Sequence, residues 1–229
     1  MSDSKPIIVE FPLRGEWLSP VTPGKQVPSH GTDRLGSRYA FDFLQVDWTR
    51  GRRPAYHVHP LAYALFGASL DSFYCWGKPI HAPFDGVVAA AEDGCRERQR
   101  AHVLSDFSVA FKSAHSFDVD KDGLQFVAGN YVILESPEGF FAALVHMQEG
   151  SVRVSEGQRV SRGDELGRVG HSGNSFSPHL HFQLMDGFDM MAAKGLPCAF
   201  AEYEVCRHGI WEPVRKGIPS DQDRIRFNG

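Results

Sequence analysis

Hydrophobic and polar residues alternate with a period of two in several short segments of this chain, and that pattern predicts β-strands. The clearest segment is 39–44, where Phe41 and Phe43 fall on one face and Asp42 falls on the other. A short helix is expected around 61–70. Further strands are expected at 7–9, within 77–84, and at 87–91, 131–135, 140–146 and 179–184, followed by short strands and turns over 187–229.

Turn-forming residues are frequent between these segments. The chain contains 23 Gly, 14 Pro and 17 Phe, which fits many short strands joined by turns better than a bundle of helices. Asp85-Gly86, for example, predicts a turn between a strand within 77–84 and a second strand at 87–91. The expected fold is mainly β, an antiparallel β-sandwich or barrel-like sheet with long loops and little helix. At 229 residues, with no internal repeat or linker, we expect a single domain over 1–229.

Charge and hydropathy argue against several classes of partner. The formal net charge of -4 gives no electrostatic reason to expect a nucleic acid or an anionic membrane. No apolar run approaches the roughly 20 residues that a membrane span needs. The first residues lack the basic start and apolar run of a secretory signal. We therefore expect a cytoplasmic chain, export by a route that the sequence does not show, or a signal already removed.

The four cysteines do not have the spacing of a metal site. Cys75, Cys95, Cys198 and Cys206 form no Cys-x-x-Cys pair. Cys198 and Cys206 could pair across a hairpin. In a chain without a secretory signal, free thiols are the preferred interpretation.

Two histidines lie two residues apart in a predicted strand. His179 and His181 alternate with Leu180, Phe182 and Leu184, so the apolar side chains can enter a core while both imidazoles face one cleft. Residues 173–178, just before the pair, are loop formers that bring the strand in from a surface turn. Two imidazoles at this separation suit a transition metal with a base beside it. Alone, the pair is equally compatible with a solvated face.

Three further residues could complete a metal site. A catalytic zinc ion takes three protein ligands from His, Asp or Glu and leaves a fourth position open. Asp42 is a candidate because an unpaired carboxylate on the mostly apolar side of a strand is costly. His30, among turn residues, and His146, at the end of a predicted strand, are the others. Each has a plainer interpretation: Asp42 can pair with Arg38, His30 can be a solvated loop residue, and His146 can be a satisfied core histidine.

A series of motifs follows along the chain. A histidine and an aspartate come first, then Gly-x-Pro-x-x-Ala-Pro-x-Asp-Gly-x-Val at 77–88, and then the strand that ends in His146. The last motif is Gly-Asn-Ser-x-x-Pro-His-Leu-His-Phe at 173–182. This order resembles the lysostaphin-type (LytM-like) zinc metalloendopeptidases, which cut peptides of the bacterial cell wall. The resemblance covers roughly 28–190, interrupted by a divergent stretch at about 45–75 and an insertion at about 92–125.

The resemblance implies a role for each candidate. His30, Asp42 and His181 would bind Zn²⁺. His146 and His179 would bind no metal and would handle protons during peptide hydrolysis.

Three nearby residues complete the set that the resemblance points to. Many family members have their first two ligands in the pattern His-x-x-x-Asp, whereas eleven residues separate His30 from Asp42 here, so Asp33 is an alternative ligand. Asp42 is preferred because it lies on the strand 39–44, while Asp33 lies among turn residues. In the loop before the histidine pair, Asn174 and His171 are expected to shape the turn and to contact the substrate.

The function implied is that of a zinc metallopeptidase acting on peptidoglycan stem peptides or cross-bridges. The chain has no His-Glu-x-x-His helix, so a glutamate base of that kind is not expected. One alternative is a catalytically silent or autoinhibited module that binds wall peptides, although the retained ligands argue against it. A phosphohistidine carrier is a third interpretation, but that chemistry does not require Asp42 and further ligands. The sequence leaves open which bond is cut and the oligomeric state.

Overall fold

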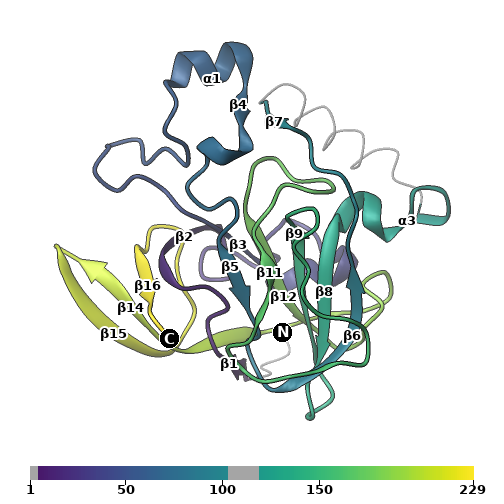
Figure 1. Cartoon of the computed structure of the whole chain (residues 1–229). Coiled ribbons are helices and arrows are strands. Elements are labelled where there is room, and N and C mark those ends of the chain that lie inside the picture. Colours follow the sequence, from purple (N-terminus) through teal and green to yellow (C-terminus); the bar gives the residue numbers. More distant parts are fainter. Residues whose placement is uncertain (1–4, 103–118) are drawn as a thin grey trace.

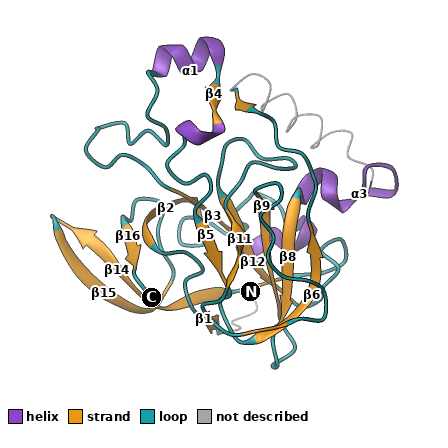
Figure 2. Cartoon of the chain, viewed as in Figure 1, coloured by secondary structure: helices purple, strands orange, loops and turns teal. Residues whose placement is uncertain are grey.

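The computed structural model of the chain describes residues 5–102 and 119–229 and is dominated by strands (Figures 1 and 2). Its helices are α1 (Pro60–Phe66) and α3 (Val119–Ala128), with two 3₁₀ turns, η1 (Arg34–Tyr39) and η2 (Leu70–Ser72). The strands are β1 (Ile7–Val9), β2 (Gly15–Val21), β3 (Phe41–Leu44), β4 (Ala68–Ser69), β5 (Pro79–His81), β6 (Gly86–Glu92), β7 (Arg100–Ala101), β8 (Asn130–Glu135), β9 (Phe141–Met147), β10 (Arg159–Val160), β11 (Glu165–Arg168), β12 (Leu180–Met185), β13 (Gly195–Leu196), β14 (Cys198–Arg207), β15 (Ile210–Gly217) and β16 (Ile225–Phe227). The mainly β prediction is confirmed.

Most strands belong to one long sheet. Its order is β1-β14-β16-β2-β3-β12-β9-β8-β6-β10, with β15 added beside β14 and β13 beside β12. Neighbours run antiparallel except β1 and β14, which are parallel. Two small sheets, β5 with β11 and β4 with β7, lie outside it. Among the described strands the long sheet does not close into a barrel, so the barrel-like form of the prediction is replaced by an open sheet.

Two local predictions differ from the structure. The strands on either side of Asp85-Gly86 do not form a hairpin, because β5 pairs with β11 whereas β6 pairs with β8 and β10. Asp85 instead caps a neighbouring turn, where its Oδ1 accepts a hydrogen bond from the backbone N–H of Arg162 at 2.7 Å. Near the C-terminus, the short strands expected over 187–229 include a long hairpin of β14 and β15, which projects at the left of Figure 1.

In the described parts of the stretches where the family resemblance is interrupted, the elements α1, the β4–β7 pair and α3 lie outside the long sheet (Figure 1). The helix expected around 61–70 is α1, at Pro60–Phe66. The insertion expected at about 92–125 includes 103–118, which lie outside the described residues. In the part of the chain that is described, no helix is long and apolar enough to cross a membrane.

Both faces of the central strands are covered. On one face, Phe41 packs against Phe43, Phe182 and Phe200, with ring centroids 5.2 to 6.5 Å apart. On the other face, a smaller cluster includes Ala143, Val145 and Met185. The alternation predicted for 39–44 is confirmed, since Phe41 and Phe43 are fully buried while Asp42 points the opposite way. Asp42 therefore projects from the face that carries the smaller cluster.

The register of three neighbouring strands brings chemistry-bearing residues together. In the antiparallel pair of β3 and β12, Asp42 lies directly opposite His181. On the other side of β12, His181 lies opposite Val145 of β9, the residue before His146. Directly opposed residues share a face of an antiparallel sheet, and their Cβ atoms lie about 5 Å apart. Strand pairing alone therefore places Asp42, His181 and the end of β9 side by side.

We expect Phe41→Ala to destabilise the chain strongly, because the substitution leaves a cavity among three buried rings. Losses of about 3–5 kcal/mol are typical for such changes, and urea unfolding would measure the difference. Phe188→Ala is the matched control, since Phe188 is 60% exposed and its loss should cost under about 0.5 kcal/mol. Equal destabilisation by both substitutions would contradict a core centred on the phenylalanine rings.

Candidate metal centre

Three side chains, His30, Asp42 and His181, converge on one point. Each offers one ligand atom, and these atoms all lie within 4.8 Å of one another. His30 Nε2 is 3.2 Å from both carboxylate oxygens of Asp42, and His181 Nδ1 is 2.9 Å from Asp42 Oδ1. The set contains two imidazoles and one carboxylate, brought together from a loop and two adjacent strands.

The orientation of His181 is set by a buried amide. Gln183, two residues along β12 and on the same face, accepts a hydrogen bond from His181 Nε2–H through Oε1 at 2.8 Å. Its Nε2 donates to the carbonyl oxygen of Leu35 at 2.6 Å. A carbonyl can only accept, so this contact fixes the amide orientation and puts the His181 proton on Nε2. The lone pair of His181 Nδ1 then faces Asp42.

The turn that carries Leu35, whose carbonyl accepts from Gln183, packs closely against β12. Leu35 has a left-handed backbone, φ 58°, and Gly36 follows at φ 70°. A Cβ added at Gly36 would lie 2.9 Å from Gln183 Nε2 and 2.9 Å from Met185 Cγ. Glycine is therefore required where this turn passes over β12, and the turn delivers the Leu35 carbonyl to the amide.

His30 is oriented in a similar way from a different loop. Its Nδ1 lies 3.1 Å from the hydroxyl of Ser29, and that hydroxyl donates to the carbonyl oxygen of Ser37 at 3.3 Å. The hydroxyl hydrogen is thereby used, so His30 Nδ1–H is the donor to Ser29 Oγ. The lone pair of His30 Nε2 is left facing Asp42.

The donor set fits a divalent zinc ion. Two imidazole lone pairs and a carboxylate are all electron-pair donors, and here they face one another at about 3 Å instead of facing hydrogen-bond donors. Such an arrangement is stabilised by a cation between the groups. His₂-carboxylate sets are a known ligand type for catalytic zinc, which keeps a further position open. Hydrogen bonds to the outer nitrogens of both rings are the supporting contacts typical of metal-binding histidines.

Two more histidines stand beside this set without joining it. The His179 ring centroid is 4.8 Å from that of His146, and His179 Nε2 is 3.6 Å from Asp42 Oδ1. His179 Nδ1–H donates to the carbonyl oxygen of Ser177 at 2.7 Å, and His146 Nδ1–H donates to that of Ser172 at 3.0 Å. With Nδ1 protonated in both rings, each Nε2 carries a lone pair. These are the two rings that can accept a proton next to the metal set.

His146 reaches His179 because its backbone leaves the regular strand geometry. In a regular strand, the residue two after Leu144 would join the phenylalanine core. His146 instead has φ 63°, and the pairing of β8 with β9 shifts register between Asn130 and Val132, close to this point. Bulges of this kind re-aim side chains near functional sites, and a left-handed non-glycine residue carries strain that the surrounding structure must offset.

Burial and electrostatic interactions shift the pKa values of Asp42, His146 and His179. Burial alone would raise the pKa of the Asp42 carboxyl, but its electrostatic interaction with His179 and its close contacts with His181 and His30 hold that pKa well below its ordinary value. Burial lowers the pKa of His146 strongly, with the nearby charge of His179 adding to the effect. Burial also keeps the pKa of His179 below its usual value. The cluster thus combines an ionised carboxylate with two imidazoles that remain neutral.

The pKa of His181 is shifted the other way. Burial lowers this pKa, but the close contact with Asp42 and the charge of that carboxylate outweigh burial and raise the net value. The ring nearest the carboxylate therefore attracts a positive charge, as expected for a position that would contact a cation.

The remaining predicted residues lie away from this point. Asp33 is 61% exposed and forms an ion pair with Arg38 at 2.7 Å, so the structure does not bring it to the group of His30, Asp42 and His181. Asn174 is partly exposed in the loop before β12, and its backbone N–H donates to Val127. His171 is fully buried, and its ring nitrogens contact Ser175 and Arg98. His171 has no exposed surface in this conformation, and its contact with substrate stays a prediction.

Sequence reasoning did not identify several residues that shape the site. Gln183 lies two residues after His181, so the same period of two that placed both histidines in the cleft could have identified it. Glu97 and Arg98 also contact the loop before β12, where Glu97 Oε1 accepts from the backbone N–H of His171 at 2.6 Å. No local pattern marks these two, because they lie in a polar stretch expected only as an insertion or long loop.

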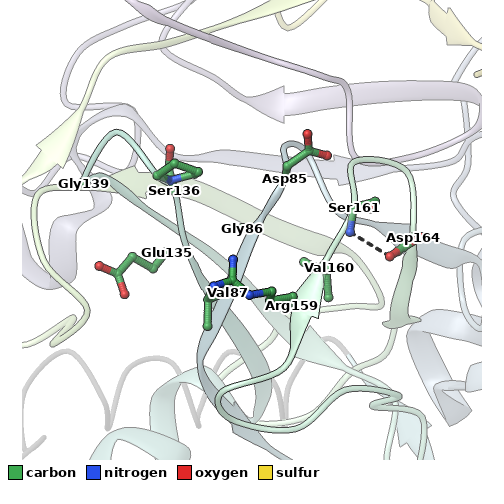
Figure 3. A pocket seen from close by; sticks show the side chains of 11 residues that line it. Asp85, Gly86, Val87, Glu135, Ser136, Gly139, Arg159, Val160, Ser161 and Asp164 are labelled. Carbon is green, nitrogen blue, oxygen red and sulfur yellow. Dashed lines mark hydrogen bonds between the residues drawn. The ribbon is translucent and has the colours of Figure 1, made fainter.

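A cavity of about 660 Å³ lies beside the start of β6 and the end of β8, away from the histidines (Figure 3). The two sites are separated by the length of β8: Asn130 donates to Ser172 beside His146, whereas Glu135 lines the cavity. Asp164, another lining residue, accepts from the backbone N–H of Ser161, as drawn in Figure 3. Asp85 and Asp164 thus both accept hydrogen bonds from backbone N–H groups and stabilise the neighbouring turns. The lining includes none of the five clustered residues His30, Asp42, His146, His179 and His181.

Comparison with known proteins gives short sequence matches. The chain is 36% identical over 58 residues to peptidoglycan DD-endopeptidase ShyA of Vibrio cholerae, a match that covers 25% of this chain and 13% of that protein. It is 30% identical over 67 residues to ShyC of the same organism, covering 29% and 15%. The chain thus matches about one seventh of the length of these relatives.

Solved structures resemble the chain only distantly. The catalytic domain of the prophage-encoded M23 protein EnpA from Enterococcus faecalis, solved as a point mutant, is 20% identical with a TM-score of 0.36, covering 63% of this chain and 85% of that one. Lysostaphin from Staphylococcus simulans is 23% identical with a TM-score of 0.36, covering 62% and 45%. Similarities at this level add nothing to the assignment of the site.

The family model for peptidase family M23 matches residues 67–193. This range is more than half of the chain and contains His146, His179 and His181. His30 and Asp42 precede the range, so their place in the site depends on the geometry described above. With a family match of this extent, the chain belongs to peptidase family M23.

Proposed function

We propose that this chain is a zinc-dependent endopeptidase that hydrolyses peptide bonds in bacterial peptidoglycan stem peptides or cross-bridges. The observation that carries the proposal is the convergence of His30, Asp42 and His181, with the lone pairs of both imidazoles turned toward the carboxylate. Membership of the peptidase family supports peptide hydrolysis, and the curated relatives are peptidoglycan endopeptidases. A cell-wall substrate requires that the chain be exported.

The three ligands would hold Zn²⁺ through His30 Nε2, a carboxylate oxygen of Asp42 and His181 Nδ1. When bound, zinc lowers the pKa of a water molecule to about 7 and polarises a peptide carbonyl. The chain's own contribution is to keep the ligands fixed: the amide of Gln183 orients one ring, and the hydroxyl of Ser29 orients the other.

The two remaining histidines would handle protons. His179 Nε2 lies next to Asp42 and carries a lone pair, because its Nδ1–H is bound to Ser177. It is placed to accept the proton of the attacking water, and once protonated the same ring can return that proton to the leaving amine. The ring of His146 is held in the same tautomer by Ser172, and its centroid lies 4.8 Å from that of His179. Its Nε2 is placed to accept a hydrogen bond from the attacking water or to share the proton transfer.

Zinc content distinguishes the two candidate carboxylates. Purified chain should contain about one zinc ion by mass spectrometry of metals, and Asp42→Ala or His181→Ala should reduce both the zinc content and the release of peptides from purified cell walls to background. Asp33→Ala is the control, because Asp33 is an exposed partner of Arg38, and it should retain both. Loss of zinc from the Asp33 variant but not from the Asp42 variant would overturn the ligand assignment.

Removal of a proton-handling ring should separate chemistry from metal binding. His179→Ala and His146→Ala are expected to retain zinc while kcat falls by about 10²–10⁴-fold, the usual contribution of a positioned acid or base. Parallel measurement of zinc content and cleavage rate tests this. A variant of either residue that keeps full kcat would show that its imidazole takes no part in the reaction.

The pH dependence of cleavage follows from the direction of the pKa shifts. Burial holds the pKa values of His146 and His179 below the ordinary histidine value of 6.5, so both rings stay neutral to lower pH than a solvent-exposed histidine. As the pH falls through the lowered pKa, the base becomes protonated and kcat/KM declines. We expect the midpoint of this acid limb below about pH 6.5, and a midpoint above that value would contradict a buried neutral base.

A further inference from the structure

Residues 95–98, here called the brace segment, cross the loop that leads into β12. The segment is first tied to the long sheet through Asn130, which is fully buried at the start of β8. Asn130 Oδ1 accepts from the backbone N–H of Cys95 at 2.7 Å, and its Nδ2 donates to the carbonyl oxygen of Cys95 at 2.9 Å. One buried amide thus fixes the start of the brace segment against a central strand.

Arg98 then reaches into the loop of residues 170–178, here called the histidine loop. One guanidinium nitrogen donates to the carbonyl oxygen of Gly173 at 3.1 Å. The other donates to the carbonyl oxygen of Ser175 and contacts His171 Nε2 at 3.1 Å. Glu97 holds the same loop from the neighbouring position, accepting from the backbone N–H of His171. A planar fork of fixed donors suits several acceptors at once.

The contacts continue from this loop to His179. The hydroxyl of Ser175 donates to the carbonyl oxygen of Ser177 at 2.7 Å and accepts from His171 Nδ1–H at 3.0 Å. The same Ser177 carbonyl receives His179 Nδ1–H, and Ser175 Oγ also lies 3.1 Å from that nitrogen. The chain of bonds from Arg98 therefore ends at the atom that decides which nitrogen of His179 carries a proton.

The ionisation of the intermediate ring agrees with this geometry. Burial, with the charge of Arg98 adding to it, lowers the pKa of His171 to about 3. His171 is therefore neutral and can accept from Arg98 through Nε2 while donating through Nδ1.

We propose that Arg98 is a positioning residue for His179, holding the histidine loop so that the Ser177 carbonyl keeps the proton of His179 on Nδ1 and its lone pair on Nε2. This inference rests on the proposed function, because the tautomer of His179 matters for turnover only if the site is catalytic. Arg98 itself touches no reacting group. It acts through the loop, from a stretch of the chain that the family resemblance does not explain.

The test substitutes Arg98→Met, which keeps most of the side-chain volume but removes every donor. We expect kcat on cell-wall peptides to fall by about 10- to 100-fold, the effect of a small misplacement of a catalytic group. KM and zinc content should be unchanged, because the three ligands lie on other segments. Arg98→Lys should recover only part of the rate, since an ammonium cannot reproduce the planar fork.

Arg100→Met is the matched control. Arg100 also donates to two backbone carbonyls, those of Phe66 and Gly67, but neither belongs to the histidine loop. It should keep the kcat of the unsubstituted chain. If Arg98→Met and Arg100→Met lower kcat equally, a general loss of stability explains the effect and the proposal is overturned.

A spectroscopic measurement keeps the inference separate from the proposed function. ¹⁵N NMR of the imidazoles should show His179 protonated at Nδ1 in the unsubstituted chain and a mixture of tautomers in Arg98→Met. An unchanged His179 spectrum in a folded Arg98→Met chain overturns the inference. If the spectrum changes but the unsubstituted zinc-loaded chain cleaves no cell-wall peptide, the proposed function fails while the positioning role stands.

Discussion

Asp42 and His181 face each other because of the register between β3 and β12, and the rest of the site depends on that pairing. Side chains alternate along a strand, so a slip of one residue would turn Asp42 toward the phenylalanine core and bring Phe41 or Phe43 to the cleft. Burying the phenylalanine rings on one face therefore determines the face on which the carboxylate lies. The alternation of side chains along β3 thus determines both the packing of the phenylalanine core and the position of the Asp42 carboxylate beside His181.

The site places an ionised carboxylate and four imidazoles in buried surroundings that penalise charge. An unsatisfied buried polar group costs about 1–3 kcal/mol, so each ring needs a partner for its outer nitrogen. The structure supplies these partners from the backbone or from short polar side chains: Ser177 and Ser172 carbonyls for two rings, and Ser29 and Gln183 for the others. These hydrogen bonds fix tautomers as well as orientations, and they leave an electron pair of each ring on the inner side.

Local alternation predicted much of this arrangement. The period of two around Asp42 and around His181 placed both residues on strands and on the correct faces, because that signal needs no knowledge of distant contacts. The same reasoning could not predict the direction of the His146 side chain. His146 has a left-handed backbone that breaks the alternation of the strand, and no residue near it in the sequence indicates that conformation. It also missed the long β14–β15 hairpin, since many positions of these strands are exposed and charged, such as Glu202 and Arg215, and give little hydrophobic contrast.

The residues that sequence reasoning missed share a physical property: they act across long separations in the chain. Arg98 and Gly173 are 75 residues apart, and Gln183 and Leu35 are 148 apart. Contacts of this kind form only after the sheet has brought the segments together, so no local pattern encodes them. They also divide the site into two parts with different supports. The proposed ligands stand on the paired strands β3 and β12 and on the loop of His30, whereas His179 follows a loop that residues 97 and 98 contact. In the proposed function, proton handling and metal binding are therefore supported by different parts of the fold.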